Sequence, residues 1–141
     1  MNQPPQTNIV ETTFHVRYAE TDQMGIVHHA AYVVWLEEGR SQWLRSNGRS
    51  YAKLEQEGFV LAVSELQVRY LQSARYDQRV TVRCWVESVQ SRQVQFNYEV
   101  VDPQNGTVFV TGYSKHICLN HAGQVTKLPD QWRALLAEKS H

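Results

Sequence analysis

Residues 17–32 read RYAETDQMGIVHHAAY, and this stretch decides the interpretation of the chain. Leading into it, Phe14, Val16 and Tyr18 alternate with polar residues, as in a strand with one buried face. After it, the apolar residues recur at helical spacing. The acidic turn between them carries Asp22, beside the unpaired N–H groups and positive dipole end of the coming helix. We therefore predict a strand at 12–19, a turn at 20–25 and chemistry at that turn.

The helix expected at 29–47 has one apolar stripe, formed by Tyr32, Trp35, Leu36, Gly39 and Trp43. Asn47-Gly48 is a typical stop signal, because glycine can take the left-handed cap. Gly39 inside a helix costs about 1 kcal/mol relative to alanine. We expect it to permit the close approach of another backbone from a sheet beneath the helix.

The rest of the chain reads mainly as strands. We expect a short helix within 50–58, strands at 59–70, 78–89, 93–101 and 107–119, turns at 102–106 and 120–123, and a terminal helix at 129–139. Residues 1–8 are polar and proline-containing and predict a flexible arm. One long helix with an antiparallel run of strands predicts an α+β fold with the helix on one sheet face. The 141 residues suit a single domain.

Composition limits the partners and the cellular compartment that we expect for this protein. Lysine plus arginine equals aspartate plus glutamate, at 14 each, so no global charge favours nucleic acid or an anionic membrane. No secretory signal and no apolar run of membrane-spanning length is visible, which predicts a soluble, cytoplasmic protein. Cys84 and Cys118 lie in strand-like runs and are expected to be buried thiols in a reducing compartment.

The stretch YAETDQMGIVHHAAY, followed by WLEEGR, resembles the 4-hydroxybenzoyl-CoA thioesterase family of hotdog-fold acyl-CoA thioesterases. A second block, VRYLQSARYDQRVTV, is also similar to that family. The resemblance covers roughly residues 12–120. It implies one antiparallel sheet wrapped around a central helix. It also implies a homo-oligomer, a dimer or a homotetramer built as a dimer of dimers, with the active site at the dimer interface and acyl-CoA as substrate.

The resemblance assigns roles to three residues of the first block. Asp22 matches the catalytic aspartate, which attacks the thioester carbonyl or activates a water. Gly25 matches the glycine of the same D-x-x-G pattern, and His29 falls where a backbone N–H would hold the thioester oxygen. The competing interpretation is that Asp22 only closes a turn or caps the helix.

Five further residues are candidates for substrate binding: Tyr32, Trp35, Phe59, Tyr70 and Arg75. Trp35 and Phe59, together with Leu36, would line an apolar cleft between subunits. Tyr32 matches an aromatic position of the family and is expected mainly to pack in the helix core. Tyr70 and Arg75 belong to the second block, which is expected to form a loop and strand edge near the partner subunit's site. Arg75 would contact the CoA phosphates, because a guanidinium suits phosphate oxygens. Lys53, Arg83 and Lys115 are weaker candidates for the same contact.

Other functions remain open. A hotdog hydroxyacyl dehydratase would combine His28 or His29 with a helix carboxylate such as Glu37, and an acyl-CoA binding module would need no catalysis. Glu37 or Glu38 could also replace Asp22 as the carboxylate, although charged helix residues are usually solvated. His28 and His29 could suggest a metal, but adjacent histidines rarely converge on one ion. We expect no metal and no cofactor. An acyl-carrier protein could present the substrate in place of CoA.

Overall fold

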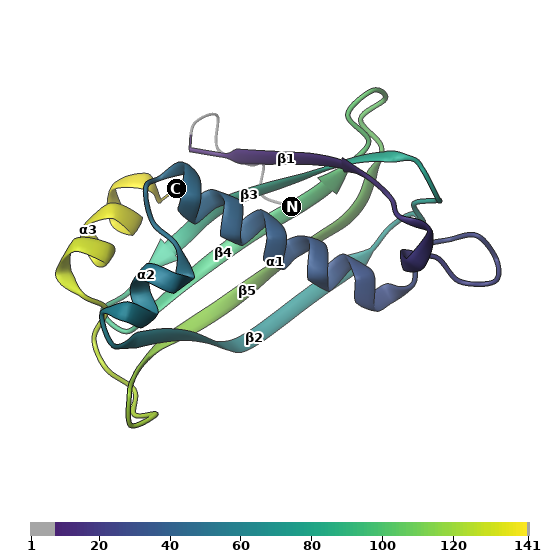
Figure 1. Ribbon diagram of the computed structural model, residues 1–141. Helices are drawn as coiled ribbons and strands as arrows, with labels where there is room; N and C mark the ends of the chain where they lie inside the picture. The colour runs from purple at the N-terminus through teal and green to yellow at the C-terminus, as the bar shows by residue number, and fades with distance from the viewer. Residues whose placement is uncertain (1–7, 141) are drawn as a thin grey trace.

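Five strands form one antiparallel sheet in the order β1-β3-β4-β5-β2. The strands are β1 (Val10–His15), β2 (Phe59–Tyr70), β3 (Arg79–Val89), β4 (Gln93–Val101) and β5 (Val108–Asn120). The computed structural model describes residues 8–140. The long helix α1 (His29–Ser46) runs across one face of the sheet, and the short helices α2 (Tyr51–Gln56) and α3 (Asp130–Lys139) lie together at one end (Figure 1). This is the predicted sheet wrapped around a central helix.

The predicted apolar stripe of α1 packs on the sheet. Tyr32, Trp35, Leu36, Gly39 and Trp43 are all buried. The explanation expected for Gly39 needs a correction, because its close neighbour is a side chain and not a backbone. A Cβ at Gly39 would lie 2.6 Å from Cγ1 of Val82 on β3. The missing side chain therefore makes room for a valine of the sheet.

The inner face of the sheet alternates as predicted. Val80, Val82, Cys84 and Val86 of β3 are fully buried, and so are Val94, Phe96, Tyr98 and Val100 of β4. Both cysteines are buried free thiols. Burial raises the pKa of Cys84 and of Cys118, so both thiols are protonated at neutral pH.

The first strand is shorter than predicted. It ends at His15, and residues Tyr18–Glu20 form the 3-10 turn η1. The N–H of Val16 still donates to the carbonyl of Gln78, the residue before β3. The N–H of Arg17, in contrast, donates to the carboxylate of Glu20, 2.8 Å away. The chain leaves the sheet there, and Tyr18, expected on the buried face, is 77% exposed.

Most of the predicted N-terminal arm lies outside the described residues. Its last residue, Asn8, is held to the fold, because its carbonyl accepts a hydrogen bond from Nε1 of Trp43 at 3.1 Å. At the other end of the chain, α3 buries Trp132 and Leu136 as its apolar side. Within residues 8–140, no helix has the length and apolar character to cross a membrane.

A chain of polar side chains runs through the core between α1 and the sheet. Nη1 of Arg40 donates to the hydroxyl of Tyr98, which bonds to Ser114, and Ser114 bonds to Nε2 of His116 at 2.8 Å. Nδ1 of His116 is buried and has no hydrogen-bond partner among the described residues. Burial first, and then the charge of Arg40, lower the pKa of His116 to about 3.

This lowered pKa predicts acid sensitivity. Between pH 6.5 and about 3 the unfolded chain binds a proton at His116 that the folded protein does not bind. The free energy of unfolding should therefore fall with decreasing pH in that window, by up to about 1.4 kcal/mol per pH unit for this one proton. We expect His116→Gln to remove that part of the slope in urea unfolding measured from pH 7 to 5. Equal slopes in the two proteins would contradict the assignment.

Candidate functional site

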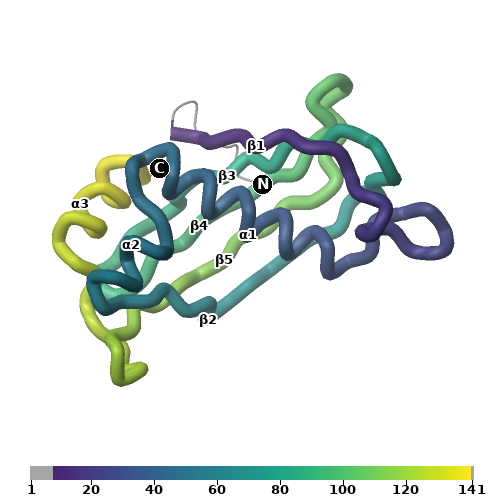
Figure 2. Tube along the Cα trace, viewed as in Figure 1, coloured from purple at the N-terminus to yellow at the C-terminus, as the bar shows by residue number. Residues whose placement is uncertain are grey.

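A closed loop of residues 21–28, here called the acid loop, joins η1 to α1 and projects from the end of the molecule where α1 begins (Figure 2). The N–H of His28 donates to the carbonyl of Glu20 at 3.0 Å and closes the loop at its base. Thr21 and Val27 pair across it, and the N–H of Asp22 donates to Ile26. Gly25 has φ +78°, a left-handed conformation that favours glycine. The sequence therefore builds a defined turn.

Asp22 lies in the acid loop with its side chain exposed. Its Oδ1 accepts the N–H of Met24 at 2.8 Å and, more weakly, that of Ile26 at 3.4 Å. Its Oδ2 has no hydrogen-bond partner within residues 8–140. Asp22 thus closes a turn, as the competing interpretation holds, but it does not cap α1, whose N-cap is His28. One carboxylate oxygen remains available for chemistry.

The first turn of α1 offers unpaired donors. His28 provides no side-chain cap, and the N–H of Ala31 bonds back to the His28 carbonyl at 3.1 Å. In the described part of the chain, the N–H groups of His29 and Ala30 have no backbone acceptor. Exposed N–H groups at the positive end of a helix dipole suit a negatively charged oxygen.

A row of aromatic rings leads from this surface into the core. The ring of Tyr70 lies against His29, with centroids 4.5 Å apart, and its hydroxyl donates to the His29 carbonyl at 3.1 Å. Tyr70 contacts Tyr32 edge-on, and Tyr32 contacts Trp35 in the same way. Tyr70 is partly exposed, whereas Tyr32 and Trp35 are buried. The last two therefore support the site from within the core.

The β2–β3 connection lies against the acid loop. Ile26 pairs with Arg75, and the N–H of Val27 donates to the Ala74 carbonyl at 2.9 Å. The N–H of Ala74 in turn donates to the hydroxyl of Tyr32 at 3.0 Å. The Arg75 side chain is exposed and makes no ion pair with any described residue. The fold thus gathers Asp22, Gly25, His29, Tyr70 and Arg75 at one end of the molecule.

Large apolar side chains are exposed around the same end: Tyr18, Met24, Tyr70, Leu71 and Tyr76. Tyr18 and Tyr76 touch edge-on, with centroids 5.4 Å apart. Exposed apolar groups gathered in this way are typical of surfaces that bind a ligand or partner.

Phe59 is not part of this group within one chain. It begins β2, and Tyr70 ends it, so the two are separated by roughly 35 Å of extended strand. Phe59 instead lines a hollow with Gly58 and His121. Its role as a substrate contact would need a second subunit.

The remaining candidates lie elsewhere or have other partners. Glu37 is eight residues beyond His29 on α1, roughly 12 Å along the axis, so this dehydratase-like pair does not meet within one chain. Glu38 accepts from Gln42 on the helix surface. Among the weaker phosphate candidates, Lys53 donates to the Gly48 carbonyl, Arg83 pairs with Glu11 and Glu99, and Lys115 pairs with Glu65.

Residues 8–140 hold no group of three or more His, Cys, Asp and Glu side chains placed to bind a metal ion. This leaves His28 and His29 without a third protein ligand in that part of the chain.

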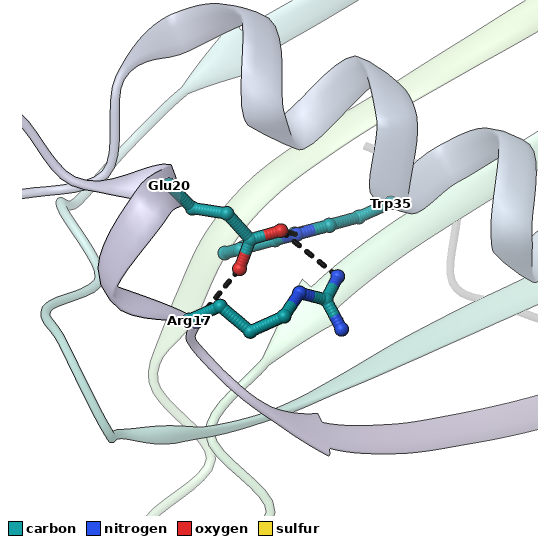
Figure 3. A network of polar contacts seen from close by, with 3 residues as sticks. All are labelled: Arg17, Glu20 and Trp35. Carbon is teal, nitrogen blue, oxygen red and sulfur yellow. Dashed lines mark hydrogen bonds and ion pairs between the residues drawn. The ribbon is translucent and has the colours of Figure 1, made fainter.

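Sequence reasoning missed Glu20 and Arg17, which tie the acid loop to α1 (Figure 3). Oε2 of Glu20 accepts Nε1 of Trp35 at 2.7 Å and Nη2 of Arg17 at 2.9 Å, and Oε1 accepts the Arg17 N–H. The only signal for these contacts in the sequence is the spacing of three residues between Arg17 and Glu20.

Comparison with known proteins agrees with this fold. Residues 16–136 match the thioesterase-like superfamily. A Bacillus subtilis protein named "Putative acyl-CoA thioesterase YneP" is 33% identical over 113 residues, which is 80% of this chain and 81% of the relative.

Two solved structures are similar over nearly their whole length. A hypothetical protein of Thermus thermophilus, TT1821, has a TM-score of 0.87 and 32% identity, covering 94% of this chain and 98% of that one. A DHNA-CoA thioesterase from Staphylococcus aureus has a TM-score of 0.85 and 30% identity, covering 90% and 87%. The match is to the superfamily, and the narrower resemblance to 4-hydroxybenzoyl-CoA thioesterases stays a prediction.

The two tyrosine hydroxyls should differ in their contribution to stability. Tyr32→Phe leaves the buried N–H of Ala74 without an acceptor, and we expect the free energy of unfolding in urea to fall by about 1–3 kcal/mol. Tyr70→Phe removes a hydroxyl at an exposed position and should cost under about 1 kcal/mol. Equal effects would mean that the Tyr32 hydroxyl does not support the connection beside the acid loop.

Proposed function

The chain belongs to the thioesterase-like superfamily, and we propose that it hydrolyses acyl-CoA thioesters to a carboxylic acid and free CoA. The observation that carries the proposal is the acid loop. It presents a carboxylate with one free oxygen and leads directly into the unpaired N–H groups of α1. The name of the B. subtilis relative supports the same substrate class. The motif in residues 17–32 supports the narrower 4-hydroxybenzoyl-CoA branch.

In this mechanism the thioester oxygen lies at the start of α1. As the carbonyl carbon becomes tetrahedral, its oxygen becomes negative, and the N–H groups of His29 and Ala30 stabilise it together with the helix dipole. Loss of one such donor typically costs about 3 kcal/mol of transition-state stabilisation. The side chain of His29 is not required for this role, because the donors belong to the backbone.

Asp22 can drive the reaction by either of two routes. As a nucleophile, its free oxygen bonds to the carbonyl carbon, the C–S bond breaks, and water then hydrolyses the resulting anhydride. As a general base, it takes a proton from a water that attacks the carbon, and the departing thiolate of CoA receives a proton. Both routes release a thiol and require the same carboxylate.

The site would be completed by a second subunit. β2 is an edge strand of 12 residues, and it exposes Val60, Val63, Leu66 and Tyr70. A long apolar edge of this kind is prone to pair with another strand. Antiparallel pairing of two β2 strands about their middle would bring Phe59 of the partner subunit beside Tyr70. This would turn the exposed end around the acid loop into a cleft, with Tyr70 and the partner's Phe59 as its apolar walls.

Arg75, at the rim of that cleft, would contact the phosphates of CoA. An acyl-carrier protein could present the same thioester, and a cytoplasmic location and a dimer-of-dimers assembly stay predictions. Tight acyl-CoA binding without thiol release would instead favour a binding module. Water elimination from a 3-hydroxyacyl thioester would favour a dehydratase.

Asp22→Asn tests the mechanism. The amide oxygen can still accept the Met24 N–H, but the side chain can no longer act as a base or nucleophile. We expect kcat for thiol release from a panel of acyl-CoAs to fall by about 10²–10⁴-fold, with KM little changed. Asp102→Asn is the matched control, because Asp102 closes another turn through the N–H groups of Gln104 and Asn105. An Asp22→Asn enzyme with full activity would remove Asp22 from the mechanism.

The subunit interface has its own test. Lysine at both Val63 and Leu66 would place four positive charges near the centre of a paired β2 edge, while each side chain stays solvated in the monomer. We expect sedimentation to show wild-type dimers or larger assemblies, and the variant to be monomeric with most activity lost. Val34→Lys is the control, because Val34 is 57% exposed on α1, similar to the 55% of Val63. A wild-type enzyme that is monomeric and active would overturn the shared site.

A further inference from the structure

Glu20 occupies a position that the proposed reaction does not explain by itself. Its carboxylate uses both oxygens, with three N–H donors within 2.9 Å: the backbone and guanidinium of Arg17 and the indole of Trp35. Its side chain is 13% exposed, compared with 61% for Arg17. Figure 3 shows the carboxylate between the 3-10 turn that carries it and the indole on α1.

The main chain of Glu20 makes a further contact. Its carbonyl accepts the N–H of His28 at 3.0 Å, which closes the base of the acid loop one residue before α1 begins. One residue therefore fixes both ends of the acid loop. Asp22 lies only two residues further along the same loop.

The indole that holds the carboxylate cannot move easily. Trp35 is 1% exposed and packs edge-on against Phe14 of β1 and Tyr32 of α1. Trp35 also belongs to the helix whose first turn carries the N–H groups of His29 and Ala30. The Glu20–Trp35 bond thus joins the loop with the carboxylate and the helix with the oxyanion donors into one rigid unit.

We propose that Glu20 is a positioning residue, which sets the distance between the Asp22 carboxylate and the backbone donors of α1. The proposal rests on the proposed thioesterase mechanism. A misplacement of about 1 Å can cost 10²-fold in rate, so a small shift of the loop would lower kcat without unfolding the protein.

The charge of Glu20 matters for this role. Burial by itself would raise the pKa of Glu20, but hydrogen bonds from Arg17 and Trp35 outweigh it and hold the pKa below its ordinary value. The ionised carboxylate accepts at both oxygens. A glutamine has only one acceptor, so its amide nitrogen would face an N–H group and displace the loop.

Glu20→Gln is the first test. We expect kcat for acyl-CoA hydrolysis to fall by about 10–100-fold with KM changed by less than about threefold. The matched control is Glu57→Gln, because Oε2 of Glu57, the residue after α2, accepts Nε1 of Trp132 on α3 at 2.9 Å, the same kind of carboxylate–indole bond. The control should keep wild-type kcat. Wild-type kcat in Glu20→Gln, or an equal loss in the control, would overturn the proposal.

Combining the change with Asp22→Asn separates positioning from a general loss of stability. If Glu20 acts through Asp22, Glu20→Gln should lower the residual rate of Asp22→Asn by less than about twofold. The same 10–100-fold loss in that background would overturn the proposal. A fully active Asp22→Asn enzyme would instead overturn the proposed mechanism, so the two failures are distinguishable.

Trp35→Phe covers the case in which Glu20→Gln does not fold. It removes the indole donor but keeps an aromatic ring between Phe14 and Tyr32. We expect a loss of kcat similar to that of Glu20→Gln, again with KM little changed. Wild-type kcat in a folded Trp35→Phe enzyme would show that the indole bond does not position the loop.

Discussion

The packing of α1 on the inner face of the sheet is the constraint on which the other parts of this structure depend. One face of the helix is buried along its whole length, from Tyr32 to Trp43 and Leu44, so its axis and rotation are fixed. The beginning of α1 is therefore placed at one end of the sheet, next to the end of β2 and the β2–β3 connection. The acid loop leads into α1, Tyr70 ends β2, and Arg75 lies in the β2–β3 connection, so all three come together at that end.

The order of strands and helices could be predicted from the sequence, for a physical reason. Period-two alternation in β3 and β4 and a helical stripe in α1 are direct consequences of burial on one side, so they appear in the order of residues. Gly39 was recognised as a contact point, although its neighbour proved to be the side chain of Val82. The end of β1 was wrong by several residues. A side-chain bond from Glu20 to the Arg17 backbone removes that segment from the sheet, and alternation does not reveal such a bond.

The candidate site was predictable only in part. The loop with Asp22 and Gly25 and the helix start at His29 follow from local signals in residues 17–32. The second block, with Tyr70 and Arg75, was expected near the site of the partner subunit, but it lies beside the acid loop of its own chain. The Glu20–Trp35 bond joins residues fifteen positions apart through side chains, so no periodicity indicates it. Phe59 was expected in a cleft between subunits, and within one chain the direction of β2 places it at the end opposite to Tyr70, so that expectation depends on a second subunit. Ser114 and His116 are residue types that often occur in active sites, but here the hydrogen-bonded pair is buried in the core.

The fit of Val82 against Gly39 has a consequence beyond stability. The valine occupies a notch in the surface of α1 that only a residue without a side chain provides, so the helix cannot slide along its axis by a turn without losing the notch. Gly39 lies ten residues, or about 15 Å, from His29. The contact between Gly39 and Val82 thus determines how far the beginning of α1 extends beyond the strands. A bulkier residue at position 39 would therefore alter the geometry at the beginning of the helix.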